Sequence, residues 1–238
     1  DWGKNLAVLP SRLAWLIGHP RSGTTLIEQV LDSHVGLISA DELDVLSRCV
    51  YPDLGVKTRV GSAAPKMLDS ANLEDVNAAR SDYWQKSEAA LREPISDRVL
   101  LDKNPELTLL LPMICRTFPE SKVLFALRDP RDVVVSCFFQ SLPLNSVSVH
   151  YLSLEDTAQQ YATTMRGWLK LREMINVDWI EVRYEDTVDD LEAQARRTLQ
   201  FLELDWDATV LDYRQRVQNK HVHSPTYEAV TKPVYRSA

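Results

Sequence analysis

The feature that most constrains this chain is a short, glycine-bounded loop between a predicted strand and a predicted helix. Residues 13–17 are apolar and predict a buried strand, and apolar residues recur at helical spacing over 26–31. Gly18 and Gly23 bound the loop that joins them. In such a unit the loop N–H groups point into one concavity, and the helix N-terminus adds unpaired N–H groups and a positive dipole end. The stretch therefore predicts a phosphate-binding loop.

The side chains of this loop narrow the phosphate chemistry. Gly18 and Gly23 have the spacing of the nucleotide-triphosphate P-loop, but Thr24 stands where that motif has its lysine. An arginine, Arg21, lies inside the loop instead. The loop is therefore expected to hold a phosphate-like group without the lysine that contacts a γ-phosphate.

The composition fits one globular domain with a sizeable core. The chain has 238 residues, of which 45% are hydrophobic and 26% are charged. Its net charge of -7 argues against nonspecific attraction to nucleic acid, so an anionic ligand has to be held by a local basic site. No apolar run approaches the length of a membrane span, and the sequence does not open on a signal-like segment. We expect no nucleic-acid partner and no membrane segment in this chain.

The three cysteines are Cys49, Cys115 and Cys137. Their odd number and the lack of C-x-x-C spacing indicate neither a disulfide framework nor a zinc site. Cys115 and Cys137 lie in apolar surroundings, so we expect core residues there rather than nucleophiles.

The rest of the chain alternates predicted strands with predicted helices. Strands are expected at residues 36–41, 98–101, 122–127 and 178–184. Helices are expected at residues 73–91, 107–118, 153–171 and 191–202, with a further helix beginning at Pro130. The segments 50–68 and 219–238 are interpreted as a loop over the site and an extended basic tail. The alternation predicts an α/β fold, with a P-loop-like central parallel sheet and helices on both faces.

Several polar residues fall at predicted strand ends, where open α/β sheets bind ligands. Glu42 follows the second strand and Lys103 follows the third. Each also has an ordinary interpretation: Glu42 as a helix cap or solvated carboxylate, and Lys103 as a surface residue in a turn. The pattern alone leaves both interpretations open.

A second candidate anion site lies after the strand at 122–127. Arg128 is placed at the strand tip, Asp129 as an N-cap and Pro130 as the first helical residue. Ser136 then lies about two turns into the helix. An arginine and a hydroxyl placed in this way can grip one phosphate from two sides, and the alternative is an ordinary capped helix.

With these residues collected, the sequence resembles sulfotransferases that use 3′-phosphoadenosine 5′-phosphosulfate. The segment 20–25, Pro-Arg-Ser-Gly-Thr-Thr, is similar to the 5′-phosphosulfate loop of that family, and 128–136 resembles its 3′-phosphate motif. Thr226 corresponds loosely to a family Ser or Thr that contacts the cofactor, although Ala229 departs from the Gln usual three residues later. The cofactor-binding residues that the resemblance implies are Arg21, Ser22, Gly23, Thr24, Thr25, Arg128, Ser136 and Thr226.

The resemblance is to one branch of the family. Cytosolic small-molecule sulfotransferases carry a loop lysine and a catalytic histidine, whereas this sequence has Arg21 and Pro105 at those places. It is similar instead to the tyrosylprotein sulfotransferases and the bacterial sulfotransferases associated with tetratricopeptide repeats. For that branch the resemblance implies Glu42 as the catalytic base and Lys103 as the residue at the leaving-group oxygen.

The implied reaction is in-line transfer of a sulfuryl group from 3′-phosphoadenosine 5′-phosphosulfate to a hydroxyl acceptor, either a peptide tyrosine or a small molecule. No metal is expected, because Lys and Arg supply the positive charge that Mg²⁺ supplies in kinases. Two alternatives stay open: a P-loop kinase acting on a small substrate, and a noncatalytic interaction module on the same fold.

The organisation of the protein is expected to follow from the same resemblance. We expect residues 1–238 to form a single sulfotransferase domain, either complete or a fragment of a longer chain. A cytoplasmic location is expected, or the Golgi lumen if the chain is a fragment of an anchored enzyme. The sequence leaves open whether the protein forms an oligomer.

Overall fold

A computed structural model describes residues 3–50, 68–91, 93–140 and 147–217. At its centre is a five-stranded parallel sheet with the strand order β2-β3-β1-β4-β5. The strands are β1 (Leu13–Ile17), β2 (Leu37–Asp41), β3 (Val99–Lys103), β4 (Lys122–Leu127) and β5 (Asp178–Arg183). Residues 51–67, most of the loop predicted at 50–68, and the tail that contains Thr226 lie outside the described residues.

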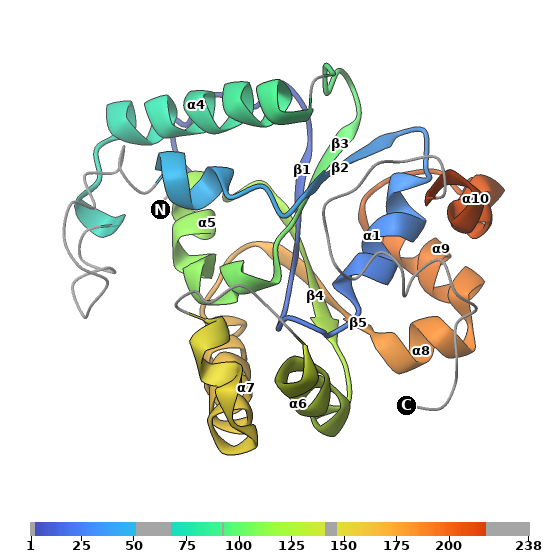
Figure 1. Ribbon diagram of the computed structural model, residues 1–238. Helices are drawn as coiled ribbons and strands as arrows, with labels where there is room; N and C mark the ends of the chain where they lie inside the picture. The colour runs from blue at the N-terminus through green and yellow to red at the C-terminus, as the bar shows by residue number, and fades with distance from the viewer. Residues whose placement is uncertain (1–2, 51–67, 92, 141–146, 218–238) are drawn as a thin grey trace.

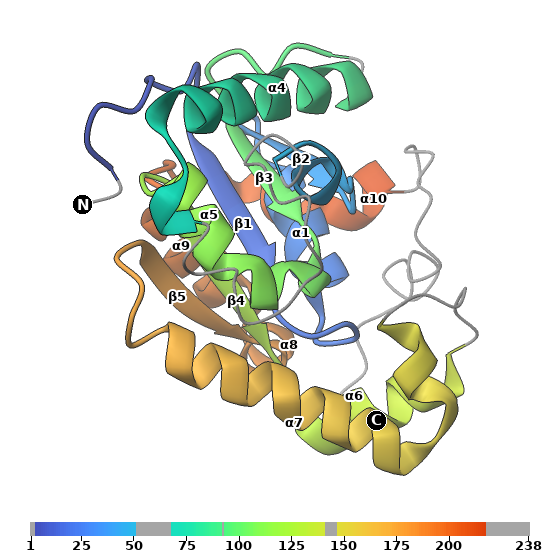
Figure 2. The same cartoon turned by 90° about the vertical axis from the view of Figure 1, so that its left-hand side faces the viewer.

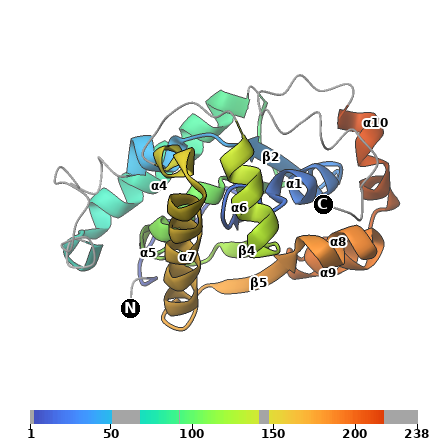
Figure 3. The same ribbon diagram turned by 60° about the horizontal axis from the view of Figure 1, so that its bottom comes forward.

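Helices connect the strands and follow the last one (Figure 1). They are α1 (Thr24–Asp32), α4 (Leu73–Leu91), α5 (Leu111–Thr117), α6 (Pro130–Phe139), α7 (Leu154–Leu171), α8 (Tyr184–Asp189), α9 (Leu191–Phe201) and α10 (Tyr213–Val217). Figure 3 shows α6 and α7 side by side, and residues of the two helices are in contact.

The central strand β1 shows why helices cover both faces of the sheet. Side chains of a strand alternate between faces, and Leu13, Trp15 and Ile17 join the core that α4, α5 and α7 cover. Ala14 and Leu16 point the other way, into the core beneath α1, α9 and α10. Figures 1 and 2 show these two helical layers on opposite sides of the sheet. The predicted α/β architecture with a doubly covered parallel sheet is confirmed.

One predicted helix is divided in two. Residues 107–118 were expected to form a single packed helix, but a 3₁₀ turn over Pro105–Leu110 precedes α5. Pro112 lies in the first turn of α5 and has no N–H, so it cannot continue the hydrogen-bond ladder of a helix that began earlier. The apolar pattern is the same in both arrangements, and the proline decides where the α-helix starts.

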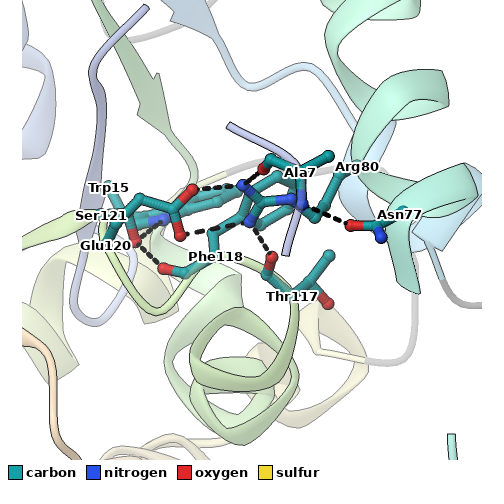
Figure 4. Close-up of polar contacts among 8 residues, drawn as sticks. All are labelled: Ala7, Trp15, Asn77, Arg80, Thr117, Phe118, Glu120 and Ser121. Carbon is teal, nitrogen blue, oxygen red and sulfur yellow. Dashed lines mark hydrogen bonds and ion pairs between the residues drawn. The ribbon is translucent and has the colours of Figure 1, made fainter. Parts of the chain in front are cut away.

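At the amino ends of the strands, Arg80 of α4 holds three segments together (Figure 4). Its Nη1 donates to the carbonyl of Thr117 and to Glu120 Oε2 at 3.1 Å. Its Nη2 donates to the carbonyl of Ala7 and to Glu120 Oε1. The arginine is buried, so these partners replace the water that its guanidinium loses on folding.

The segment between α5 and β4 is tied to the central strand as well. Trp15 Nε1 donates to Ser121 Oγ at 2.8 Å, and Ser121 Oγ donates to the carbonyl of Phe118 at 2.6 Å. Arg80 also lies over the Phe118 ring, with its Cζ 5.5 Å from the ring centroid. Figure 4 shows these contacts as one continuous group. These contacts fix the amino end of the sheet.

Replacement of Arg80 by Met is expected to lower the free energy of unfolding by about 2–4 kcal/mol, because it leaves two carbonyls and one carboxylate without their buried donor. Urea denaturation monitored by circular dichroism measures the change. Glu120→Gln is the control: the Glu120 side chain is 45% exposed, so a loss below about 1 kcal/mol is expected. Equal losses in the two variants would contradict a clamp centred on the arginine.

Candidate active site

The carboxyl edge of the sheet brings together the residues predicted from separate strand ends. Gly18 follows β1, Lys103 ends β3 and Arg128 follows β4, while Glu42 follows β2. Because the strands are parallel, all four lie at one edge. The strand order places Glu42 and Lys103 on one side of the glycine loop and Arg128 on the other. The edge therefore carries a carboxylate–lysine group and an arginine group that flank one loop.

The glycine loop is anchored at both ends. Gly18 N donates to Thr108 Oγ1 at 3.1 Å, and Thr108 Oγ1 donates to the Gly18 carbonyl at 2.5 Å. Gly23 is the N-cap of α1 with a left-handed φ of 90°, and it has no side chain to accept the first helical N–H groups. Thr24 and Thr25 form the first turn of α1. A helix that begins in this way presents N–H groups and a positive dipole end at the loop.

Arg21 connects the loop to α6. Its φ is 71°, and its Nε donates to Ser136 Oγ at 2.9 Å. Arg128 Nη1 in turn donates to the Arg21 carbonyl at 3.4 Å. The structure thus gathers the two predicted arginines and the predicted serine at one place, although 115 positions separate Arg21 from Ser136 in sequence.

Arg128 lies in a partly desolvated position with one unused donor. Its side chain is 13% exposed, its Cζ lies 4.4 Å from the centroid of the Tyr184 ring, and its Nη2 is 3.6 Å from Asp132 Oδ2. Its Nε is buried and has no hydrogen-bond partner among the described residues. Buried donors of this kind are rare, and a charged one is suited to bind an anion.

Lys103 is fully buried among carboxylates. Its Nζ is 2.7 Å from Asp41 Oδ1, 2.7 Å from Glu42 Oε1 and 3.4 Å from Glu28 Oε2. Burial alone would favour the neutral amine, but the three acids outweigh it and raise the pKa of Lys103 above its ordinary value. Lys103 is therefore a fixed cation at the end of β3, not the surface residue of the alternative interpretation.

Glu42 stands at the boundary between this cluster and solvent. Its side chain is 49% exposed, and its N–H donates to the Lys103 carbonyl at 3.0 Å. Its φ is 43°, in the left-handed region that non-glycine residues seldom adopt. The backbone turns sharply at this residue, so the carboxylate reaches both Lys103 and solvent.

Sequence reasoning missed Glu28 altogether, and it noted Asp41 beside Glu42 at the strand end without assigning it to the site. Glu28 is 1% exposed on α1, and it accepts a hydrogen bond from Ser39 Oγ. Burial raises the pKa of Glu28 to about 7, against the opposing effect of Lys103. One feature of the sequence could have identified Glu28: it lies within a helix whose apolar residues, Leu26 and Val30, pack against the sheet. A charged residue on such a short buried helix needs a partner.

His19 contributes no charge to the loop. It is 1% exposed, and burial lowers the pKa of its imidazole to about 4, so the ring is neutral near pH 7. Its Nδ1 donates to the Pro20 carbonyl at 2.8 Å, and its ring meets the Tyr161 ring edge-on at 5.2 Å. Within the loop, the positive side chain is that of Arg21.

The core positions predicted for Cys115 and Cys137 can be compared with the structure. Cys115 and Cys137 are buried with free thiols. Burial raises the pKa of Cys115 to about 12 and that of Cys137 to about 11, so both are protonated thiols near pH 7. Their predicted place in the core is confirmed.

Two kinds of feature are absent from the described residues. No group of three or more His, Cys, Asp or Glu side chains there is arranged to hold a metal ion. No described helix combines the length and the apolar character needed to cross a membrane.

Comparison with known proteins places this geometry in a family. A family model described as "Sulfotransferase family" matches residues 15–208, which include the loop, the lysine cluster and the arginine pair. The chain belongs to the sulfotransferase family.

Its relatives include both uncharacterised and named proteins. An uncharacterised protein of Aquifex aeolicus is 27% identical over 232 residues, which cover 95% of this chain and 30% of that protein. Protein-tyrosine sulfotransferase A of Caenorhabditis elegans is 29% identical over 213 residues, which cover 84% of this chain and 52% of that protein. The chain thus spans about half or less of the length of these two relatives.

Solved structures agree on the fold. The sulfotransferase domain of the olefin synthase of Synechococcus PCC 7002 has a TM-score of 0.64 and 23% sequence identity, with coverage of 99% of this chain and 88% of that one. The sulfotransferase domain from the curacin biosynthetic pathway has a TM-score of 0.60 and covers 87% of this chain.

Gly23→Ala is expected to lower the free energy of unfolding by about 1–3 kcal/mol, because alanine would be strained at a φ of 90°. The added Cβ would also lie 2.5 Å from Cδ2 of Tyr184, the ring beneath Arg128. Gly36→Ala is the matched control, because the atoms nearest its added Cβ would be the end of Leu204 and the His34 ring, at 3.0 Å or more. Chemical denaturation compares the two, and equal stability would contradict a glycine requirement in the loop.

Proposed function

We propose that this protein transfers a sulfuryl group from 3′-phosphoadenosine 5′-phosphosulfate to a hydroxyl acceptor. One observation carries the proposal: the half-exposed carboxylate of Glu42 lies 2.7 Å from the buried ammonium of Lys103, beside a loop suited to phosphate. The pair places a proton acceptor and a cation at adjacent points of one site. Membership of the sulfotransferase family supports this interpretation.

The residues present fit the donor that the family implies. The N–H groups at the start of α1, with Arg21, Thr24 and Thr25, would hold the 5′-phosphosulfate end. Arg128, whose Nε lacks a partner among the described residues, and Ser136 would hold the 3′-phosphate. When bound, the donor supplies an activated sulfuryl group.

The chemistry assigned to the chain is proton transfer and charge stabilisation. Glu42 accepts the proton of the acceptor hydroxyl as its oxygen forms the new bond to sulfur. Lys103 donates a hydrogen bond to the phosphate oxygen that keeps the electron pair of the broken S–O bond. Arg21 and the loop N–H groups offset the negative charge of the group in transfer. Each step uses a side chain at the carboxyl edge.

Glu42 has to exchange its partner for this reaction. Its Oε1 now accepts a hydrogen bond from Lys103, and that bond has to be released before this N–H of the ammonium can reach the leaving-group oxygen. Its 49% exposure gives it room to move, whereas Lys103 is fully buried and keeps Asp41 beside it. The base is therefore the mobile member of the pair.

For the acceptor we favour a tyrosine hydroxyl of a peptide, with a small hydroxyl metabolite as the second candidate. The supporting observation is the similarity to protein-tyrosine sulfotransferases over most of this chain. Incubation of the protein and donor with tyrosine peptides and with small phenols and alcohols tests the choice. Mass spectrometry is expected to detect a gain of one SO₃ on the peptides, and a gain only on small molecules would reverse the preference.

Glu42→Gln is expected to lower kcat by about 10²–10⁴, because the amide cannot accept the proton. Calorimetry should find the affinity for adenosine 3′,5′-bisphosphate nearly unchanged. Asp44→Asn is the matched control two positions away, where an exposed carboxylate pairs with Arg48, and it should keep the kcat of the unaltered protein. Full kcat in Glu42→Gln would remove Glu42 from the role of base.

Arg128→Ala is expected to weaken binding of adenosine 3′,5′-bisphosphate at least about tenfold, since charge-assisted hydrogen bonds contribute about 1.5–3 kcal/mol each. Arg131→Ala is the control, because its side chain is 87% exposed and pairs with Asp129. Isothermal calorimetry measures both. Equal affinities in the two variants would contradict the 3′-phosphate assignment.

The same calorimetry separates the proposed function from its alternatives. A sulfotransferase should bind adenosine 3′,5′-bisphosphate without metal in preference to ATP with Mg²⁺. The reverse preference would favour a P-loop kinase. Binding of neither nucleotide would favour an interaction module.

A further inference from the structure

We propose that Glu28 is a positioning residue for Lys103: its buried carboxylate lies 3.4 Å from the ammonium and attracts it, so that an N–H of Lys103 can point at the leaving-group oxygen. This inference rests on the proposed sulfuryl transfer. Glu28 itself touches neither the acceptor nor the donor in this scheme, and it acts through Lys103.

Glu28 joins the three elements that build the lysine side of the site. It lies on α1, the helix that begins at the phosphate loop. Its Oε1 accepts from Ser39 Oγ of β2, and its Oε2 lies 3.4 Å from Lys103 Nζ at the end of β3. A single side chain thus connects the phosphate loop helix to the catalytic lysine. A shift of α1 would move the loop and the lysine partner together.

The three carboxylates around Lys103 differ in their exposure to solvent, and this difference separates their roles. Glu42 is 49% exposed and Asp41 is 25% exposed, but Glu28 is only 1% exposed. Glu28 therefore cannot exchange Lys103 for a ligand that enters from solvent. The other ionisable groups near it are carboxylates, Asp41 and the buried Asp32, so Lys103 is its cationic partner.

The number of ammonium donors explains why a third carboxylate is useful. A lysine ammonium has three N–H groups, and three carboxylates surround Lys103. When Glu42 turns to the acceptor, Asp41 at 2.7 Å and Glu28 at 3.4 Å still attract the ammonium, and the N–H that Glu42 accepted is free for the oxygen left on the nucleotide. Without Glu28 the ammonium can rotate, because Asp41 alone fixes only one direction.

The decisive variant is Glu28→Gln, which keeps an oxygen for the Ser39 hydroxyl and removes the charge. The assay is run at about pH 8, on the alkaline side of the raised pKa of Glu28, because higher pH favours the ionised carboxylate. We expect kcat to fall about 10- to 100-fold, as a small misplacement of a catalytic group does, with KM and adenosine 3′,5′-bisphosphate affinity within about twofold. Glu28→Asp, which keeps the charge, should recover part of the lost kcat.

The matched control is Asp32→Asn. Asp32 is a second buried acid of α1, and its Oδ1 accepts from Ser39 N at 2.9 Å. Its replacement changes the same helix–strand contact without altering a partner of Lys103, so kcat should stay near that of the unaltered protein. An equal loss of kcat in Asp32→Asn and Glu28→Gln would mean that the helix contact, and not Lys103, accounts for the effect.

A double-variant cycle tests whether Glu28 acts through Lys103. In a Lys103→Met background, Glu28→Gln should cause no further loss of kcat. The proposal would be overturned if the two single-variant losses of kcat multiplied in the double variant. It would also be overturned if Glu28→Gln kept the kcat of the unaltered protein.

A measurement that does not depend on turnover keeps this inference separate from the proposed function. The protein is labelled with ¹³Cε-lysine, and the NMR resonance of Lys103 is assigned from its loss in Lys103→Met. This resonance should shift in Glu28→Gln and stay in place in Asp32→Asn. An unmoved resonance would overturn the pairing even if the protein transfers sulfuryl groups. A moved resonance in a protein without sulfotransferase activity would leave the pairing intact and refute the proposed function.

Discussion

The arrangement of the site depends on one buried cation. Lys103 is fully removed from water, and isolated burial of an ammonium would cost several kcal/mol. Carboxylates from α1, β2 and the residue after β2 surround it, so these segments have to meet in one register for the charge to be compensated. The parallel sheet provides that register, since Asp41 lies directly opposite Lys103 in the β2–β3 pair. The charge cluster and the strand pairing therefore support each other.

On the opposite side of the loop, the positive side chains have different kinds of partner. There Arg128 lies over the Tyr184 ring with a carboxylate contact to Asp132 at 3.6 Å, and Arg21 donates to the Ser136 hydroxyl. Hydroxyl and aromatic partners leave more of the positive charge uncompensated than carboxylates do. The two sides of β1 thus differ in character: one carries arginines beside an aromatic ring and a hydroxyl, and the other carries a buried lysine among carboxylates.

The sequence was sufficient to predict the fold and the positions of the strand-end residues, because both depend on local signals. Apolar runs, the glycine loop and the Asp129-Pro130 cap each lie within a few residues of what they predict. The Glu28–Lys103 contact depends on how α1 packs across the sheet, and no local pattern encodes a pairing between residues 75 positions apart. Likewise, the apolar pattern of 107–118 did not distinguish a 3₁₀ turn from an α-helix.

The left-handed backbone at Arg21 and Glu42 bears on how such a protein can be engineered. Both positions have positive φ values, at which glycine would be less strained by about 1 kcal/mol or more. A library of variants selected only for heat resistance would therefore accumulate glycine there and discard the guanidinium and the carboxylate. Stabilisation is better directed at the amino end of the sheet, where the Arg80 contacts are separate from this edge.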